Sequence, residues 1–372
     1  MQKISRAEIE KICDKFEIKG KMIEVQECSS GHIHDTYIVT CDEGHQHRRY
    51  ILQRVNTKVF PDVEKVMDNI IRVTSHILHK AKQDKTIDPE RATLRFIRVR
   101  NSEKYFVYDS CGSAWRMYFM VEKTHTYDVL TNAEQAYEAA KAFGRFQKYL
   151  ADFPPPPLHE TISNFHNTPK RFEALHKAIK EDVAGRRKKC QPEIDFALSM
   201  EDMGKIIVQG IEKKEIPIRV CHNDTKINNV LFDDETDKAV CVIDLDTVMP
   251  GSALYDFGDE VRTTVGFFAE NTLDLSSVVA DVRCFENLVR GFLEETRDFL
   301  TKTEIELLYH SGIIITLEIG IRFLADYLQG DVYFKIHRPE ENLDRARTQF
   351  ALIRSLQQQE RQMQQIVKRY AG

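Results

Sequence analysis

The sequence predicts an α+β fold of two lobes, a small β-rich N-terminal lobe and a larger, mainly helical C-terminal lobe. Residues 1–121 carry short segments that mix β-branched and aromatic residues, which is typical of strands. Residues 122–372 instead carry long stretches with apolar residues at helical spacing. A chain of 372 residues is also longer than one hydrophobic core usually supports. We therefore expect residues 1–121 and 122–372 to form the two lobes.

The N-terminal lobe is predicted to be a sheet with one long helix. Apolar residues recur every three or four positions from residue 63 to residue 78, which predicts a helix there. The segments around this helix are rich in strand-forming residues and are mostly separated by turn signals. The expected strands are residues 22–25, 36–40, 50–55, 93–98, 105–108 and 115–121.

The C-terminal lobe is predicted to be helical on both sides of a short β segment. Thr131 and Glu134 form a capping-box pattern, followed by an apolar helical stripe that four consecutive prolines, 154–157, bring to an end. A polar loop between two short apolar runs occupies residues 219–248. The further helices are expected at residues 169–181, 193–212, 277–297, 303–328 and 342–369.

Composition and charge exclude several classes of protein. Hydrophobic residues make up 42% of the chain and charged residues 30%, as in globular proteins. The formal net charge of −5 argues against a dedicated nucleic-acid binder. The first 20 residues lack the apolar stretch of a secretory signal, and the apolar run 307–317 is short for a membrane span. We expect a cytoplasmic protein with no membrane or nucleic-acid partner, whose eight cysteines are reduced.

Residues 219–246 carry a motif with the spacing of phosphoryl-transfer loops. His222-x-Asp224 is followed by Asn229, and the apolar run 240–243 then leads to Asp244. Phosphoryl transfer needs a carboxylate to accept the proton of the acceptor hydroxyl, and oxygen ligands to hold magnesium. Asp224 is the candidate base, and Asn229 and Asp244 are candidate ligands. Asp and Asn also form ordinary turns, but turns alone do not explain the whole pattern.

HNDTKINNVLFD and VIDLDTVMPGSALYDFGDEVRT resemble the aminoglycoside phosphotransferase/choline kinase family, which has a protein-kinase-like fold, and more specifically the N-acetylhexosamine 1-kinases. The segments SGHIHDTYIV, YILQRVN, VFPDVEKVMDNI and RFLADYLQGDVYFK extend the resemblance over most of the chain. It implies transfer of a phosphoryl group from ATP, with Mg²⁺, to a small-molecule hydroxyl. The acceptor that it implies is the anomeric C1 hydroxyl of an N-acetylhexosamine.

The resemblance also implies roles for individual residues of the motif. These are Asp224 as the catalytic base, Asn229 and Asp244 as magnesium ligands, His222 as the histidine that supports the loop, and Asp256 as the acid that braces it. Asp246 lies two residues beyond Asp244 and is expected on the same side of a strand. There it would support the site or touch a second metal ion.

For the nucleotide, the resemblance implies a phosphate loop around Gly31 and His32, although a single glycine makes a sparse phosphate loop. Protein kinases have a strand lysine where this chain has Gln53 and Arg54; we expect Arg54 to reach the phosphates and to pair with Glu64 or Asp68. Phe119, Met120 and Val121 would form the hinge whose backbone binds adenine.

The acceptor site is expected on the helix at residues 303–328. Glu318, Arg322 and Asp326 fall on one face of this helix among apolar residues, and we expect the two carboxylates to hold the Arg322 guanidinium. The resemblance places Arg322, Asp326 and Tyr333 at the acceptor, with Asp224 at its hydroxyl and His32 closing over it. A surface ladder of ion pairs would explain the same spacing.

Several alternatives remain open. Choline, homoserine, methylthioribose and aminoglycosides are alternative acceptors, and GTP is an alternative donor. VIDLDTV, residues 242–248, also fits the aspartyl-phosphate phosphatases, in which Asp244 would be a nucleophile. The missing strand lysine admits a kinase-fold binding protein without turnover. We expect a monomer or a weak dimer.

Overall fold

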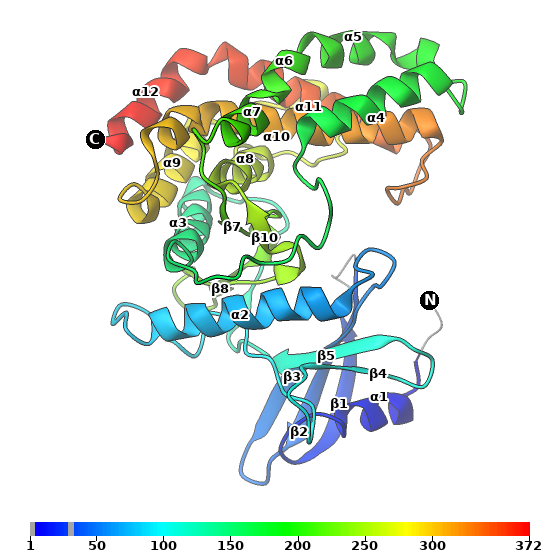
Figure 1. Cartoon of the computed structure of the whole chain (residues 1–372), viewed down its shortest axis with the longest axis vertical. Helices are drawn as coiled ribbons and strands as arrows, with labels where there is room; N and C mark the ends of the chain where they lie inside the picture. The colour runs from blue at the N-terminus through cyan, green and yellow to red at the C-terminus, as the bar shows by residue number, and fades with distance from the viewer. Residues whose placement is uncertain (1–3, 29–32) are drawn as a thin grey trace. The chain divides into compact units, whose positions relative to one another are not determined.

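The structure is a computed structural model of the chain, and it describes residues 4–28 and 33–372 (Figure 1). The chain divides into two compact units. Unit 1 comprises residues 1–124, 158–162 and 241–247, and unit 2 comprises the remaining residues. The main division lies near the predicted lobe boundary at residue 121. The segment 241–247, which carries Asp244 and Asp246, belongs to unit 1 although it comes from the second half of the sequence.

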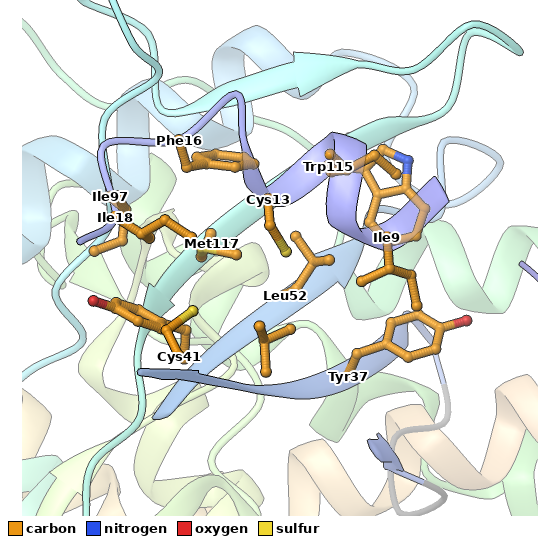
Figure 2. Close-up of a cluster of buried hydrophobic side chains, with 13 residues drawn as sticks. Ile9, Cys13, Phe16, Ile18, Tyr37, Cys41, Leu52, Ile97, Trp115 and Met117 are labelled. Carbon is orange, nitrogen blue, oxygen red and sulfur yellow. The ribbon is translucent and has the colours of Figure 1, made fainter. Parts of the chain in front are cut away.

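Unit 1 is built on a five-stranded antiparallel sheet of order β1-β2-β3-β5-β4. Its strands are β1 (Lys21–Cys28), β2 (Asp35–Asp42), β3 (His47–Arg54), β4 (Phe106–Tyr108) and β5 (Ala114–Phe119). The N-terminal helix α1 (Arg6–Cys13) adds Ile9 and Cys13 to a buried cluster with Leu52, Trp115 and Met117 (Figure 2).

The long helix α2 (Val63–Ala81) confirms the helical pattern predicted at 63–78. Neighbouring residues of a strand point to opposite faces of the sheet, so Arg116 of β5 turns away from the cluster of Trp115 and Met117. Its Nη1 lies 4.0 Å from the sulfur of Met67 on α2. The strand β5 therefore places a charged side chain between the sheet and α2.

The strand predicted at 93–98 is wrong, because only an isolated bridge between Phe96 and Tyr118 forms there. The reason is that β5 pairs with β3 along one edge, and the first part of its other edge pairs with β4. Only the end of β5 remains for the segment that contains Phe96, through the bonds Ile97 N–H to Met117 O and Phe119 N–H to Arg95 O. Two such bonds do not extend into a ladder.

Unit 2 is mainly helical, as predicted. The central helix α10 packs against α4, α8 and α11, and α3 packs against α9. Short strands β7 (Arg219–Cys221) and β10 (Met249–Gly251) pair with each other, and β6 (Thr124–His125), β8 (Val230–Asp233) and β9 (Ala239–Val242) form a sheet of order β6-β8-β9. The helices are α3 (Ala133–Tyr149), α4 (Thr168–Glu181), α5 (Gln191–Ser199), α6 (Glu201–Gly204), α7 (Ile206–Glu212), α8 (Ala253–Thr264), α9 (Val282–Thr296), α10 (Lys302–Gln329), α11 (Glu341–Gln358) and α12 (Glu360–Ala371).

Two details of the predicted helices are corrected. The capping box of α3 is formed by Asn132 and Gln135, one residue later than predicted: the Asn132 side chain accepts the Gln135 N–H, and the Gln135 side chain accepts the Asn132 N–H. Asn is at least as good an N-cap as Thr, so both registers were chemically possible. The expected helix 193–212 is divided among α5, α6 and α7, and the expected helix 342–369 breaks at Gln359 between α11 and α12.

Among the described residues, one helix is long and apolar enough to cross a membrane by length and composition. This helix is α10, and 78% of its most apolar window is buried inside the protein. The core helix of a soluble protein passes the same test.

Candidate active site

The loop that follows β7 is held by the imidazole of His222. This side chain is fully buried, and its ring packs edge-on against Phe143 and Phe146 of α3, with centroids 5.4 and 5.8 Å away. Its Nδ1 lies 3.2 Å from the backbone nitrogen of Asp224, whose N–H it accepts. Packing and hydrogen bonding together position the backbone of Asp224.

Asp256 of α8 braces the same loop. Its carboxylate accepts the backbone N–H groups of His222 at 3.0 Å and Asn223 at 2.7 Å, and the side-chain amide of Gln147 at 2.5 Å. Its backbone oxygen also accepts the Thr225 hydroxyl at 2.6 Å. Burial raises the pKa of Asp256 above its ordinary value, although these hydrogen bonds favour the ionised form.

The carboxylate of Asp224 is oriented by two neighbours on its own loop. Its Oδ2 lies 3.0 Å from the ammonium of Lys226 and accepts the Asn229 side-chain amide at 3.1 Å. The same amide donates to the Asp224 backbone oxygen at 2.8 Å. Burial alone would raise the pKa of Asp224, but the charge and hydrogen bond of Lys226, together with His222 and Arg262, outweigh burial and lower the pKa. Asp224 is therefore ionised at neutral pH and can accept a proton.

The orientation of Asn229 leaves its oxygen as a ligand atom. Both of its side-chain hydrogen bonds within the described residues are donated by Nδ2, toward Asp224. The amide oxygen, on the other side of the group, is the kind of neutral oxygen ligand that magnesium accepts.

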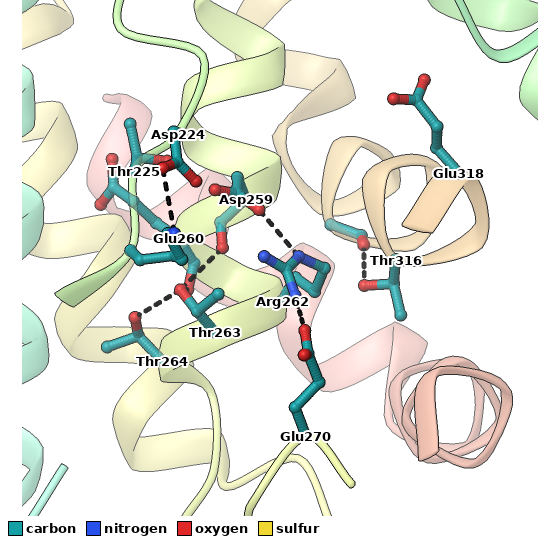
Figure 3. A network of polar contacts seen from close by, with 12 residues as sticks. Asp224, Thr225, Asp259, Glu260, Arg262, Thr263, Thr264, Glu270, Thr316 and Glu318 are labelled. Carbon is teal, nitrogen blue, oxygen red and sulfur yellow. Dashed lines mark hydrogen bonds and ion pairs between the residues drawn. The ribbon is translucent and has the colours of Figure 1, made fainter. Parts of the chain in front are cut away.

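A network of charges joins the buried Asp259 and Arg262 of α8 to the exposed Glu270 beyond that helix (Figure 3). The guanidinium of Arg262 binds Asp259 at 2.7 Å and Glu270 at 3.0 Å, and its positive charge contributes to the low pKa of Asp224. Glu260 is 1% exposed, and neither of its carboxylate oxygens has a hydrogen-bond partner among the described residues. Burial accordingly raises the pKa of Glu260 well above its ordinary value.

In unit 1, the segment of Asp244 and Asp246 differs from the predicted strand. The strand β9 ends at Val242, Asp244 has a φ of 60°, and Asp246 lies in a short 3-10 helix, Leu245–Thr247. The strand predicted at these two residues is therefore wrong, although ligand atoms of Asp244 and Asp246 do lie within 4.8 Å of each other. Asp and Asn tolerate the left-handed conformation because their short polar side chains bond locally.

Asp246 is bound by a side chain that the sequence analysis did not identify. Arg116 donates to both of its oxygens, at 2.7 and 2.6 Å, and Nε2 of His34 lies 3.3 Å from Oδ2. Burial would raise the pKa of Asp246, but Arg116 and then His34 hold it well below its usual range. A signal was present in the sequence: an arginine within the apolar run WRMYFMV requires a buried partner.

Ligand atoms of His34, Asp244 and Asp246 lie within 4.8 Å of one another and are a candidate metal group. Magnesium prefers oxygen ligands, which the imidazole of His34 does not supply. Both oxygens of Asp246 already accept hydrogen bonds from Arg116. The donor set therefore fits magnesium at Asp244 better than at Asp246, which instead anchors the segment.

The residues expected at the nucleotide have varied surroundings. Gly31 and His32 lie outside the described residues. Arg54 pairs with Asp35, its Nε lying 2.6 Å from Oδ2, so its expected pairing with Glu64 or Asp68 is wrong. Those two acids bind nearer cations: Lys104 lies 3.0 Å from Glu64, and Arg72 and His159 lie 3.4 and 3.2 Å from Asp68.

The expected hinge begins at Phe119, the last residue of β5. The Met120 N–H donates to the Arg49 backbone oxygen at 3.1 Å, and the Val121 oxygen accepts the Thr124 hydroxyl at 2.8 Å. Two guanidinium groups lie near the ring of Phe119, that of Arg48 at 5.4 Å and that of Arg95 at 4.7 Å. Phe119 and Met120 also line an open cavity of about 580 Å³ in unit 1.

On α10, the expected ion pairs of Arg322 are wrong. Glu318 instead lies 2.9 Å from Nδ1 of His166 and accepts the Thr168 hydroxyl at 2.8 Å. Asp326 accepts the backbone N–H groups of residues 332, 333 and 334 at 2.8–2.9 Å, and the side-chain amide of Asn342 at 2.9 Å. Asp326 thus shapes the loop that carries Tyr333, whose side chain is 69% exposed.

Arg322 is surrounded by aromatic rings. Its guanidinium carbon lies 5.8 Å from the ring of Phe165, 5.9 Å from that of Tyr333 and 5.5 Å from that of Phe334. Within residues 4–28 and 33–372, no hydrogen bond or ion pair engages its N–H groups. The rings hold the guanidinium through cation–π contacts and leave its donors available. The sequence offered no pattern by which to find Phe165 or His166.

Comparison with known proteins identifies a family and similar folds. The model of a family described as "Phosphotransferase enzyme family" matches residues 24–275, which include Asp224, Asn229, Asp244 and Asp256. Similar solved structures include a microcompartment-associated aminopropanol kinase (13% identity, 96% of this chain and 98% of that chain, TM-score 0.62). Others are spectinomycin phosphotransferase in complex with ADP and spectinomycin (12%, 96% and 100%, 0.61) and choline kinase from Cryptosporidium parvum (14%, 99% and 99%, 0.59).

At these identities the structural likeness concerns the fold, and it confirms the α+β kinase-like fold predicted from the sequence. The family match covers more than half of the chain and contains the whole loop built around Asp224. The chain belongs to the phosphotransferase enzyme family.

Proposed function

We propose that this protein is an ATP- and magnesium-dependent kinase of a small-molecule hydroxyl, and that the acceptor is the anomeric C1 hydroxyl of an N-acetylhexosamine. The observation that carries the kinase proposal is the state of Asp224. Its carboxylate is ionised, is oriented by Lys226 and Asn229, and lies on a loop that His222 and Asp256 hold in place. A preorganised carboxylate of this kind suits the role of catalytic base.

In the proposed reaction the acceptor hydroxyl attacks the γ-phosphorus of ATP. A bond forms between the acceptor oxygen and phosphorus, the bond from phosphorus to the β–γ bridging oxygen breaks, and ADP leaves. Asp224 orients the hydroxyl and takes its proton. Magnesium held by Asn229 and Asp244 would neutralise charge on the phosphate oxygens.

The surroundings of Arg322 support an oxygen-rich acceptor. Its guanidinium has donors that no described residue engages, and such donors suit sugar hydroxyls and an acetamido oxygen. The exposed ring of Tyr333 adjoins it and offers an apolar face with a polar hydroxyl. Choline and aminoglycosides are cations, which the charge of Arg322 would repel.

The structure of spectinomycin phosphotransferase with bound ADP supports ATP as the donor, since that protein shares the fold. We propose that the enzyme is cytoplasmic. Its proposed partners are the nucleotide and the sugar. GTP remains the alternative donor.

The test is ADP release from Mg-ATP with a panel of acceptors. The panel contains N-acetylglucosamine, N-acetylgalactosamine, choline, 1-amino-2-propanol and an aminoglycoside. We expect the highest kcat/KM for an N-acetylhexosamine, with a product that phosphorus NMR identifies as the 1-phosphate. A higher kcat/KM for an amine would refute the sugar and keep the kinase. No turnover of any acceptor would favour the binding-protein alternative.

A further inference from the structure

Two arginines of unit 2 meet at one aromatic residue. Arg171 of α4 donates from Nη2 to the backbone oxygen of Phe165 at 2.7 Å, and Arg322 of α10 lies over the ring of Phe165. Both side chains are partly exposed. Burial, and then the like charge of Arg322, lower the pKa of Arg171. The two positive charges therefore lie close enough to repel each other.

The nearby carboxylate does not bind either guanidinium directly. Glu318 interacts electrostatically with both arginines, but its oxygens accept from His166 and Thr168. Burial opposes the charged form of His166, but the charge of Glu318 and the hydrogen bonds to Glu318 and to the backbone oxygen of Asn223 together raise its pKa. When His166 is protonated, three cationic groups face one carboxylate.

Donors of both guanidinium groups also lack partners. Nε of Arg171 is buried and has no hydrogen-bond partner among the described residues. No described residue engages the N–H groups of Arg322, whose other neighbours are the rings of Tyr333 and Phe334. The other acid of this helix face, Asp326, is engaged by loop amides and Asn342. Two positive charges and several N–H donors without partners thus lie close together beside Phe165.

We infer that the acceptor carries an anionic oxygen group, a carboxylate, phosphate or sulfate, and that this group binds at Arg171 and Arg322 beside Phe165. Such a group neutralises the repulsion between the arginines, and its oxygens match the planar array of guanidinium donors. The inference rests on the proposed function, because it assigns a charged substituent to the same acceptor. It names Arg171 as a specificity residue in addition to Arg322.

The experiment compares neutral and anionic sugars by titration calorimetry in the presence of Mg-ADP. N-acetylglucosamine is measured against its 6-phosphate and its 6-sulfate, and glucose against glucuronic acid, which separates the three kinds of anion. The variants are Arg171→Met and Arg322→Met. Lys170→Met is the matched control, because Lys170 precedes Arg171 in the chain, is exposed, and pairs with Glu173 at 2.8 Å. Thermal melting confirms that each variant is folded, and Arg171→Gln replaces Arg171→Met if the latter is not.

We expect at least one anionic sugar to bind the wild type tenfold or more tightly than its neutral parent. That preference should fall to within twofold in both arginine variants and persist in Lys170→Met. Equal binding of neutral and anionic sugars, no binding of any sugar, or a preference that survives both arginine substitutions would overturn the inference.

A separate measurement, ADP release by the same preparations, tests the proposed function. Turnover of neutral N-acetylglucosamine without any preference for anions overturns the inference alone. Preference for an anionic sugar without turnover of any sugar overturns the sugar-kinase proposal alone.

Discussion

Arg116 and Asp246 form a two-point ion pair inside unit 1, with Nη1 2.7 Å from Oδ1 and Nη2 2.6 Å from Oδ2. The side chains are 3% and 2% exposed. Gln53 of β3 accepts from the same guanidinium at 2.8 and 3.0 Å. The pair therefore ties two strands of the sheet to the short helix that follows Asp244.

Removing one member of this pair should destabilise unit 1. We predict that Arg116→Met lowers the free energy of unfolding of unit 1 by about 3–5 kcal/mol, because it leaves the Asp246 carboxylate buried without its cation. The double variant Arg116→Met/Asp246→Leu should recover most of the loss. The single tryptophan, Trp115, lies in the core of unit 1, so its fluorescence during urea unfolding measures this change. Equal stability of the single variant and the wild type would contradict the prediction.

The proposal that Asp224 is the catalytic base is tested by Asp224→Asn. The substitution keeps the shape of the side chain and removes proton acceptance, so kcat should fall at least 100-fold while the Kd for Mg-ATP stays within about twofold. Steady-state kinetics and calorimetry measure the two quantities. Asp298→Asn is the control, since that side chain is 91% exposed. A decrease of less than about tenfold in kcat would show that Asp224 is not the base.

Asp244 is tested as a metal ligand by Asp244→Asn. An amide in place of a carboxylate binds a divalent cation more weakly, so the magnesium concentration for half-maximal rate should rise by about tenfold and kcat should fall. An unchanged magnesium dependence would exclude Asp244 as a ligand. The phosphatase alternative makes a different prediction, a phosphorylated Asp244 that acid quenching and mass spectrometry would trap.

The sequence could predict the part of the site whose residues lie close together in the chain. Asp224 and Asn229 are five residues apart on one loop, and their hydrogen bonds follow from that spacing. The pairing of Arg116 with Asp246 spans 130 positions and depends on how the segment of Asp246 meets the sheet, which no local pattern encodes. An unmatched charge in an apolar strand signals that a partner exists and does not identify it.

The helix α10, on which the acceptor site is proposed, shows a different limit of sequence-based prediction. Spacing placed Glu318, Arg322 and Asp326 on one face, and on an isolated helix such neighbours do pair. In the folded unit, His166 and Thr168 compete for Glu318, and backbone amides from the loop compete for Asp326. Glu318 and Asp326 therefore bind groups from distant segments, because buried carboxylates accept hydrogen bonds from the donors that tertiary packing places beside them.

These partners change the expected behaviour of Arg322→Ala. Because neither Glu318 nor Asp326 depends on Arg322 for a hydrogen bond, the variant should fold, with a melting temperature close to that of the wild type. Loss of a charge-assisted hydrogen bond of about 1.5–3 kcal/mol should raise the KM for the acceptor tenfold or more. The KM for ATP should remain within about twofold. A folded variant with an unaltered acceptor KM would remove Arg322 from the acceptor site.

The pair of His166 and Glu318 should give unit 2 a stability that depends on pH in a defined window. For Glu318, burial is outweighed by His166 together with Arg322 and Arg171, and the pKa lies below the ordinary value of 4.5. The contribution of Glu318 is therefore present above about pH 4.5 and is lost as the pH falls through its lower folded value. For His166, whose pKa is raised above 6.5, the contribution is complete below about pH 6.5 and is lost as the pH rises through its higher folded value. The pair therefore contributes most between about pH 4.5 and 6.5.

The contribution of the pair to stability can be measured by comparing the wild type with the double variant His166→Gln/Glu318→Gln. This variant replaces both groups with neutral ones of similar size. The difference in the free energy of unfolding, followed by circular dichroism because unit 2 is mainly helical, should be largest in that window and should decline on both sides of it. Groups titrating elsewhere in the chain cancel in this difference when the two proteins share them. A difference that is constant from pH 4 to pH 9 would mean that the pair does not ionise as its contacts indicate.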